Sequence, residues 1–372
     1  MTCKERIIKA LSGEKVDRIP FSPFLAYWWE NQSDDLTRVG ELEFLESIGA
    51  DPLFRGHYPM YGKEGEDLIL CKTHINDCEI ITRTEGVRRL VVYHTSRGNL
   101  TFGYQYVERG NTWFLVDHPV KDEEDFILLK YIMDSTYLEP DYERFDRAVE
   151  DLGERGLILP LICPEMKSSF QSLLEKWVGT ENLVYSLMDY PEIVEEVLMS
   201  MRRVSNKAAV IAAESNSPFF LSWEDTSTTN ISPQYYRDYI LPEINEWCDI
   251  LHKKGKKYVQ HACGQLKELL PDIAKSHIDV LESISPAPTG NIEIEQVQSI
   301  LPSKMAIVGG IEPVKLLQDS IENVTEQANK LIDTFQKRGY ILANSDSCPP
   351  GVSIEKFKRL SEVAAERKSY HQ

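Results

Sequence analysis

Eight short β-rich runs alternate along the chain with amphipathic stretches, and this alternation most constrains the fold. The runs are Ile19–Phe24, Asp51–Arg55, Leu157–Cys163, Phe219–Asp225, Lys257–Gly264, Ile278–Ser285, Met305–Ile311 and Tyr340–Cys348. In the stretch Pro233–Lys253, apolar residues such as Tyr236, Ile240 and Ile244 recur at helical spacing. Because alternating strands and helices are typical of a parallel sheet, eight such units predict one closed (β/α)8 barrel of the TIM type.

One segment interrupts the alternation and accounts for the length of the chain. The 372 residues exceed the ~250 that one barrel typically fills. Residues 68–120 carry alternating runs separated by turn residues, namely Glu79–Arg83, Arg88–His94, Leu100–Val107 and Thr112–Asp117. This pattern predicts a β-hairpin or meander inserted after the second barrel strand, in a chain that is otherwise one domain over residues 1–372. Insertions on the loop face of a barrel usually shape the site, and a peripheral addition is the alternative.

The charge balance and the hydropathy exclude two classes of protein. Lys and Arg total 41 against 59 Asp and Glu, so the formal net charge is −18, which argues against nucleic acid as the main partner. No apolar run approaches the ~20 residues that cross a bilayer, and the first residues contain no apolar signal core. We therefore expect a soluble cytoplasmic protein.

Two of the seven cysteines stand where a barrel places its chemistry. His261 and Cys263 close the fifth predicted strand, and Cys348 closes the eighth. Residues two apart in a strand point to the same face, and the C-terminal ends of barrel strands carry the catalytic groups. Two thiolates and one imidazole with an open fourth position are typical of a catalytic zinc ion. The alternative is a buried strand thiol beside a hydrogen-bonded core histidine.

The remaining cysteines have no comparable partner nearby in the sequence. Seven cysteines in 372 residues are too few for a disulfide scaffold, and their number is odd. We interpret as structural thiols Cys3, Cys71, Cys78, Cys163 and Cys248.

Three carboxylates also lie near predicted strand ends. Glu224 and Asp225 close the fourth strand, where a carboxylate can act as a general acid or base or can orient substrate. The alternative role is to cap loop amides. Glu282 lies near the end of the sixth strand and is predicted to face the substrate.

An aromatic cluster follows the first predicted strand. Tyr27, Trp28 and Trp29 offer flat apolar surfaces that suit an aromatic substrate. Packing within a helix or the core is the alternative for this cluster.

Segments spread over nearly the whole chain carry a family resemblance. They are residues 4–21 (KERIIKALSGEKVDRIPF), 232–247 (SPQYYRDYILPEINEW), 256–264 (KKYVQHACG), 308–313 (VGGIEP) and 339–357 (GYILANSDSCPPGVSIEKF). These segments resemble the uroporphyrinogen decarboxylase superfamily. The resemblance implies a (β/α)8 barrel.

One branch of that superfamily fits better than its parent enzyme. The decarboxylase should carry an arginine-rich motif just after the first strand, and residues 24–30 (FLAYWWE) contain no arginine. His261, Cys263 and Cys348 match the His-x-Cys…Cys motif of the zinc- and cobamide-dependent methyltransferases. This resemblance implies a catalytic Zn²⁺ and a separate corrinoid protein as methyl carrier.

The sequence therefore predicts methyl transfer from a small methylated donor, with a methoxylated aromatic favoured, to cobalt(I) of a corrinoid protein. Zinc would act as a Lewis acid on the departing phenolate oxygen. One alternative is methyl transfer from a methylcorrinoid protein to a thiol such as coenzyme M. Porphyrinogen decarboxylation and a catalytically dead binding module are less favoured. A homodimer is one candidate state. Because the net charge is strongly negative, docking with a corrinoid protein should rely on local patches.

Overall fold

Seven named strands of the computed structural model, which describes residues 1–59, 67–108 and 111–367, are parallel strands of one barrel. Five of them form a sheet in chain order: β9 (Phe219–Glu224), β10 (Lys257–Ala262), β11 (Val280–Ile284), β12 (Ala306–Ile311) and β13 (Tyr340–Asn344). A second parallel pair joins β1 (Leu53–Arg55) to β8 (Leu157–Leu159). Each of these strands lies within or overlaps a run predicted from the sequence.

Short bridges close these strands into a ring. Leu161, just after β8, forms a parallel bridge to Leu221 of β9, and Phe21 forms one to Leu342 of β13. The Asp51 amide, just before β1, donates a hydrogen bond to the Phe21 carbonyl at 2.7 Å. Phe21 therefore supplies the eighth position and connects β13 to β1, which confirms the (β/α)8 barrel.

The first predicted strand is much shorter than expected. Within Ile19–Phe24 the structure has a single bridge, at Phe21. Pro20 and Pro23 flank it on either side. Proline has no N–H to donate, so the ladder cannot extend through these positions.

Helices surround the barrel, and α1 (Cys3–Leu11) closes its N-terminal end. Ile7 and Leu11 of α1 belong to the same buried cluster as the inward-facing residues of the strands. Gly339, directly before β13, approaches α1 so closely that a Cβ atom would stand 2.2 Å from the Ala10 carbonyl oxygen. The opposite, C-terminal end of the strands is therefore the open mouth.

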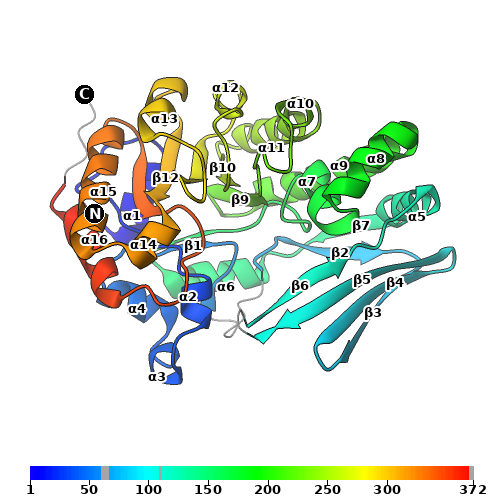
Figure 1. The fold of residues 1–372 in the computed structure, drawn as a ribbon, viewed down its shortest axis with the longest axis horizontal. Coiled ribbons are helices and arrows are strands. Elements are labelled where there is room, and N and C mark those ends of the chain that lie inside the picture. Colours follow the sequence, from blue (N-terminus) through cyan, green and yellow to red (C-terminus); the bar gives the residue numbers. More distant parts are fainter. Residues whose placement is uncertain (60–66, 109–110, 368–372) are drawn as a thin grey trace.

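The other helices connect the strands or flank the insertion (Figure 1). They are α2 (Tyr27–Glu30), α3 (Asp34–Thr37), α4 (Glu41–Ser47), α5 (Glu123–Asp134), α6 (Glu143–Leu152), α7 (Ser169–Ser172), η3 (Leu173–Trp177), α8 (Thr180–Asp189), α9 (Pro191–Glu214), α10 (Pro233–Tyr235), η4 (Tyr236–Ile240), α11 (Leu241–His252), α12 (Leu270–Ile273), α13 (Ile294–Ile300), α14 (Pro313–Gln318), α15 (Ile321–Phe335) and α16 (Ile354–Ala365). Across the described ranges, none of the helices combines the length and apolar character needed to span a bilayer.

The insertion is a four-stranded antiparallel meander that extends from the side of the barrel (Figure 1). It comprises β3 (Cys78–Glu85), β4 (Arg88–Thr95), β5 (Gly98–Val107) and β6 (Thr112–Asp117). The sequence did not reveal β2 (Cys71–Ile75), which pairs antiparallel with β7 (Thr136–Pro140) from beyond the insertion.

Candidate active site

The mouth of the barrel is built by the two-residue period of its strands. Four residues each lie two positions beyond an apolar residue of the barrel interior, and so continue the inward face toward the open end. They are Arg55 after Leu53, Trp223 after Leu221, His261 after Val259, and Glu282 after Val280.

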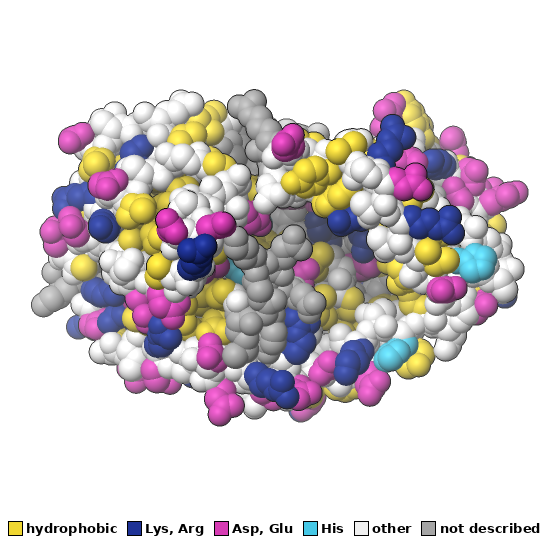
Figure 2. All heavy atoms as spheres, turned by 90° about the horizontal axis from the view of Figure 1, so that it is seen from below, with side chains coloured by type: hydrophobic (Ala, Val, Ile, Leu, Met, Phe, Trp, Pro, Cys, Tyr) yellow, Lys and Arg dark blue, Asp and Glu magenta, His cyan; other side chains and the backbone are white. Residues whose placement is uncertain are grey.

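A cavity of about 1160 Å³ occupies this mouth. Its lining includes Trp223, Asp225, His261 and Cys263 from the strand ends, and Asp346 from the loop after β13. Thr112 and Phe114 of β6 complete the wall, so the insertion reaches the mouth. Figure 2 shows one face of the molecule hollowed between the barrel half and the half that carries the insertion.

His261 is held by a carboxylate on the neighbouring strand. Its Nδ1 atom lies 3.1 Å from Oε2 of Glu282, and both side chains are buried. The Arg55 guanidinium donates to the other oxygen of Glu282 and to the Leu53 and Ser22 carbonyls. Burial opposes ionisation of Glu282, but Arg55 and His261 outweigh it and hold its pKa at about 2. Within the described chain no hydrogen bond is made by His261 Nε2, so this atom is open for a ligand.

Cys263 contacts the predicted acid Asp225. The thiol donates a hydrogen bond to Asp225 Oδ1 at 2.5 Å. Burial, together with the charges of Asp225 and Asp346, raises the pKa of the Cys263 thiol far above its usual range. The thiol is therefore protonated until a cation takes the place of its proton.

Cys348 lies at the edge of the same mouth. It is fully buried, and its amide donates to the Phe24 carbonyl at 3.0 Å. Its Sγ atom is 3.8 Å from the Pro349 carbonyl oxygen, and burial raises the pKa of the thiol. Its neighbours Ser347 and Pro349 line the cavity. In the part of the chain that the structure describes, no three His, Cys, Asp or Glu side chains are grouped closely enough to hold a metal ion.

Glu224 does not face the mouth, although it was predicted beside Asp225 as a catalytic carboxylate. Successive residues of a strand point to opposite faces, so Glu224 points outward from the barrel and is fully buried. It accepts hydrogen bonds from the Ser168 amide at 2.6 Å, the Ser168 hydroxyl at 2.8 Å and the Ser222 hydroxyl at 3.0 Å. Burial raises the pKa of Glu224 to about 7. Glu224 thus ties the loop after β8 to β9.

The aromatic cluster divides between the mouth and the core. Tyr27 lines the cavity. Trp28 is buried, donates its indole N–H to the Val352 carbonyl at 2.7 Å, and contacts Phe44 with the rings 5.0 Å apart. Trp29 also contacts Phe44, with the ring centroids 5.7 Å apart.

A different aromatic pair forms a wall of the cavity. Phe24 and Trp223 stack with their ring centroids 5.5 Å apart and their planes 16° from parallel. The rings of His261 and Trp223 meet edge to face, with their centroids 4.8 Å apart. The sequence did not predict a site role for Phe24, Trp223, Arg55 or Asp346. The two-residue spacing of Trp223 from Leu221 and of Arg55 from Leu53 is the signal that identifies two of them.

Comparison with solved structures agrees with the barrel fold. The whole chain is similar in fold to a methyltransferase from Methanosarcina mazei, with a TM-score of 0.57, 14% identity, and coverage of 98% of this chain and 99% of that chain. A B12-independent methionine synthase from Shewanella sp. W3-18-1, in complex with selenomethionine, matches with a TM-score of 0.48, 11% identity, and coverage of 94% and 97%. At these identities the first match supports the fold alone, and the second carries no further argument.

The sequence itself establishes the family. Residues 116–367 match the family described as uroporphyrinogen decarboxylase (URO-D), and the chain belongs to this family. No curated protein matches the sequence.

Proposed function

We propose that this protein is a zinc-dependent methyltransferase that moves a methyl group from a methoxylated aromatic to cobalt(I) of a corrinoid protein. The observation that carries the proposal is the contact of Glu282 with His261 Nδ1. A histidine that binds a metal typically donates its other ring N–H to a carboxylate, which fixes the tautomer and the ring orientation. Nε2 of His261 is thereby left for the cavity that Cys263 also lines.

The donor set fits zinc. Two thiols and an imidazole are ligands of the softness that zinc accepts, and they leave a fourth position for substrate. His261 and Cys263 line one cavity, and Cys348 lies beside it. The three donors are not grouped around one point in the described chain, so binding would require their side chains to rearrange.

When bound, zinc would supply Lewis-acid stabilisation to the oxygen that departs from the methyl group. The other contributions come from the chain. The stacked pair of Phe24 and Trp223, with Tyr27, offers a flat surface that orients an arene. Asp225 accepts a hydrogen bond from the Cys263 thiol in the resting protein and is placed to take its proton when the thiolate forms. Thr112 and Phe114 of the insertion form part of the cavity wall beside this surface.

The fold and the family add support of a general kind. The similar structure from Methanosarcina mazei is described as a methyltransferase. The parent reaction of the family, porphyrinogen decarboxylation, is less favoured, since residues 24–30 contain no arginine and the guanidinium of Arg55 is bound by Glu282.

Metal analysis tests the proposal directly. Protein purified without oxygen should contain one zinc ion per chain, and Cys263→Ala and Cys348→Ala should each lose most of it. Cys71→Ala, on β2 away from the mouth, is the matched control and should keep its zinc. If zinc is absent from the wild type, or unchanged in both mouth variants, the proposal is wrong.

An activity assay distinguishes the two directions of transfer. Zinc-loaded enzyme is mixed with chemically reduced cobalamin and a series of methoxybenzoates, and the visible absorbance of cobalt(I) is followed. Loss of this absorbance with an arene supports the proposal. If no arene reacts but methylcobalamin methylates coenzyme M, then the thiol is the substrate and arene demethylation is wrong.

A further inference from the structure

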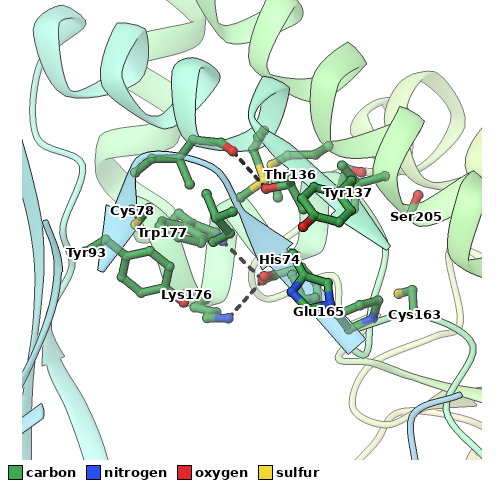
Figure 3. Close-up of a pocket in the computed structure, with 18 of the residues that line it drawn as sticks. His74, Cys78, Tyr93, Thr136, Tyr137, Cys163, Glu165, Lys176, Trp177 and Ser205 are labelled. Carbon is green, nitrogen blue, oxygen red and sulfur yellow. Dashed lines mark hydrogen bonds and ion pairs between the residues drawn. The ribbon is translucent and has the colours of Figure 1, made fainter. Parts of the chain in front are cut away.

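A second cavity, of about 600 Å³, lies between the insertion and the side of the barrel (Figure 3). Its walls come from β2, β3, β4, β7, α5, α7, η3, α9 and the loop after β8. Among the residues described, Lys167 is the one side chain shared between its lining and that of the mouth. This cavity is therefore a separate compartment adjacent to the mouth.

Most of the lining is apolar and aromatic. Tyr93 and Trp177 meet edge to face with ring centroids 5.4 Å apart, and His74 stacks on Tyr137 with centroids 4.9 Å apart. Aliphatic side chains such as Ile80 complete the wall. A cavity of this volume and character is typical of a site for a small organic molecule.

An ion pair stands in the wall beside the aromatic edge. Oε2 of Glu165 accepts hydrogen bonds from Lys176 Nζ at 3.0 Å and from Trp177 Nε1 at 3.1 Å (Figure 3). It also accepts one from the Ser172 hydroxyl at 2.7 Å. Burial opposes the charge on both partners, but their mutual attraction lowers the pKa of Glu165 and raises that of Lys176. Both groups are therefore ionised at neutral pH.

Lys176 has N–H donors that its ion pair with Glu165 does not use. An ammonium group carries three N–H donors, and in the described chain Lys176 donates one hydrogen bond, to Glu165. Its other close neighbours are the rings of Trp177 and Phe102, with Nζ 5.4 Å and 6.0 Å from their centroids. About a third of the side chain is exposed, and Lys176 lines the cavity.

The charged side chains around the cavity are paired. Lys176 pairs with Glu165, and Lys167 pairs with Glu175, which is not part of the lining. The N–H donors of Lys176 that Glu165 does not use are therefore what this largely apolar compartment offers to an anionic group.

We propose that this cavity binds a small, flat, hydrophobic carboxylic acid, whose carboxylate accepts from Lys176 and whose apolar body lies against Tyr93, Trp177 and Ile80. The site is separate from the methyl-transfer site and requires neither zinc nor a corrinoid.

Calorimetric titration of the full-length protein tests this site with two matched probes, 2-naphthoate and 2-naphthamide. Naphthoate should bind once per chain and at least about tenfold more tightly than the amide, because a charge-assisted hydrogen bond is lost in the amide. Lys176→Met should reduce the affinity for naphthoate to that for the amide. Lys130→Met, which removes an α5 lysine paired with Asp134, is the matched control and should change neither affinity.

Two further variants keep the test decisive. Val204→Phe adds a ring to the α9 wall and should weaken both probes, even if Lys176→Met fails to fold. Cys263→Ala alters the mouth and should leave naphthoate binding unchanged. The site is refuted by any of these results: no binding of naphthoate, equal affinity for acid and amide, full affinity in Val204→Phe, or loss of binding in Cys263→Ala. Because no zinc is added, failure here is distinct from failure of the proposed methyl transfer.

Discussion

Glu282 places a carboxylate oxygen 3.1 Å from Nδ1 of His261, and its other oxygen is bound by Arg55. Three barrel strands, β1, β10 and β11, thus contribute one residue each to a buried chain of contacts that ends on the histidine ring. Arg55 keeps Glu282 ionised, and Glu282 fixes the tautomer of His261 with its Nδ1 protonated.

This relationship predicts the effect of neutralising Glu282. In Glu282→Gln the amide cannot accept a hydrogen bond with the strength of a carboxylate, so zinc affinity should fall about 10- to 100-fold. Competition with a chromogenic chelator measures this change. Glu46→Gln, which breaks a surface ion pair with Arg155, is the control and should keep the wild-type affinity. Unchanged affinity in Glu282→Gln would show that His261 is not a ligand.

Zinc binding should depend steeply on pH. The pKa values of the Cys263 and Cys348 thiols are both raised, mainly by burial, so both thiols are protonated at neutral pH in the metal-free protein. Each thiol that binds zinc must release its proton, so affinity should rise by up to about tenfold per pH unit for each proton released. Chelator competition between pH 6.5 and 8.5 measures the slope. A flat profile is incompatible with two thiolate ligands.

The pH dependence of folding stability should reveal the raised pKa of the buried Glu224. Its folded-state pKa of about 7 lies above the ordinary value of ~4.3, so the folded protein binds the proton more tightly than the unfolded chain. The resulting stabilisation is complete below the ordinary pKa and is lost as pH rises toward 7, at roughly 1 kcal/mol per pH unit. Glu224→Gln lacks this dependence, so its stability relative to wild type should increase from pH 5 to pH 7.

Urea unfolding at several pH values measures this difference. Glu46→Gln is again the control, because Arg155 lowers the pKa of Glu46 and its titration falls below this range. Parallel behaviour of Glu224→Gln and wild type would contradict the assignment of a raised pKa to Glu224.

The two tryptophan environments predict opposite phenotypes. Trp223→Ala removes half of the stacked wall and should weaken binding of a methoxyarene about tenfold with a smaller effect on folding. Trp28→Phe removes a buried hydrogen bond to Val352 and should cost about 1–2 kcal/mol of stability with arene affinity unchanged. Calorimetry and urea unfolding of both variants separate the two effects. Equal arene affinity in Trp223→Ala and wild type would remove this wall from the substrate site.

The barrel could be predicted because its signals are local. Runs such as Lys257–Ala262 and Ala306–Ile311 are apolar and β-rich, and polar helices separate them. It was harder to predict which of Glu224 and Asp225 faces the mouth. Successive strand residues point to opposite faces, and the end of a predicted strand is uncertain by about one residue. Only the register of β9 places one carboxylate in the core and the other in the mouth.

Features that depend on distant segments could not be predicted. The pairing of β2 with β7 joins two five-residue strands from either side of the meander. Arg55 and Glu282 are 227 positions apart in the sequence, and neither belongs to a motif that identifies its partner. Trp28 and Trp29 resemble a ligand surface in the sequence, but the burial of Phe44 and Phe357 draws Trp28 into the core.

The loop between β8 and α7 separates the two cavities. Glu165 lines the second cavity, Met166 lines the mouth, and Lys167 lines both. Met166 holds a left-handed backbone with φ of 64°, and its carbonyl accepts from the Trp223 amide at 2.7 Å, so the loop has little slack. If a ligand in the second cavity moved Glu165, the loop would also move Met166 at the wall of the mouth. By thermodynamic linkage, a ligand in one cavity that changes the affinity of the other cavity by some factor would have its own affinity changed by the same factor.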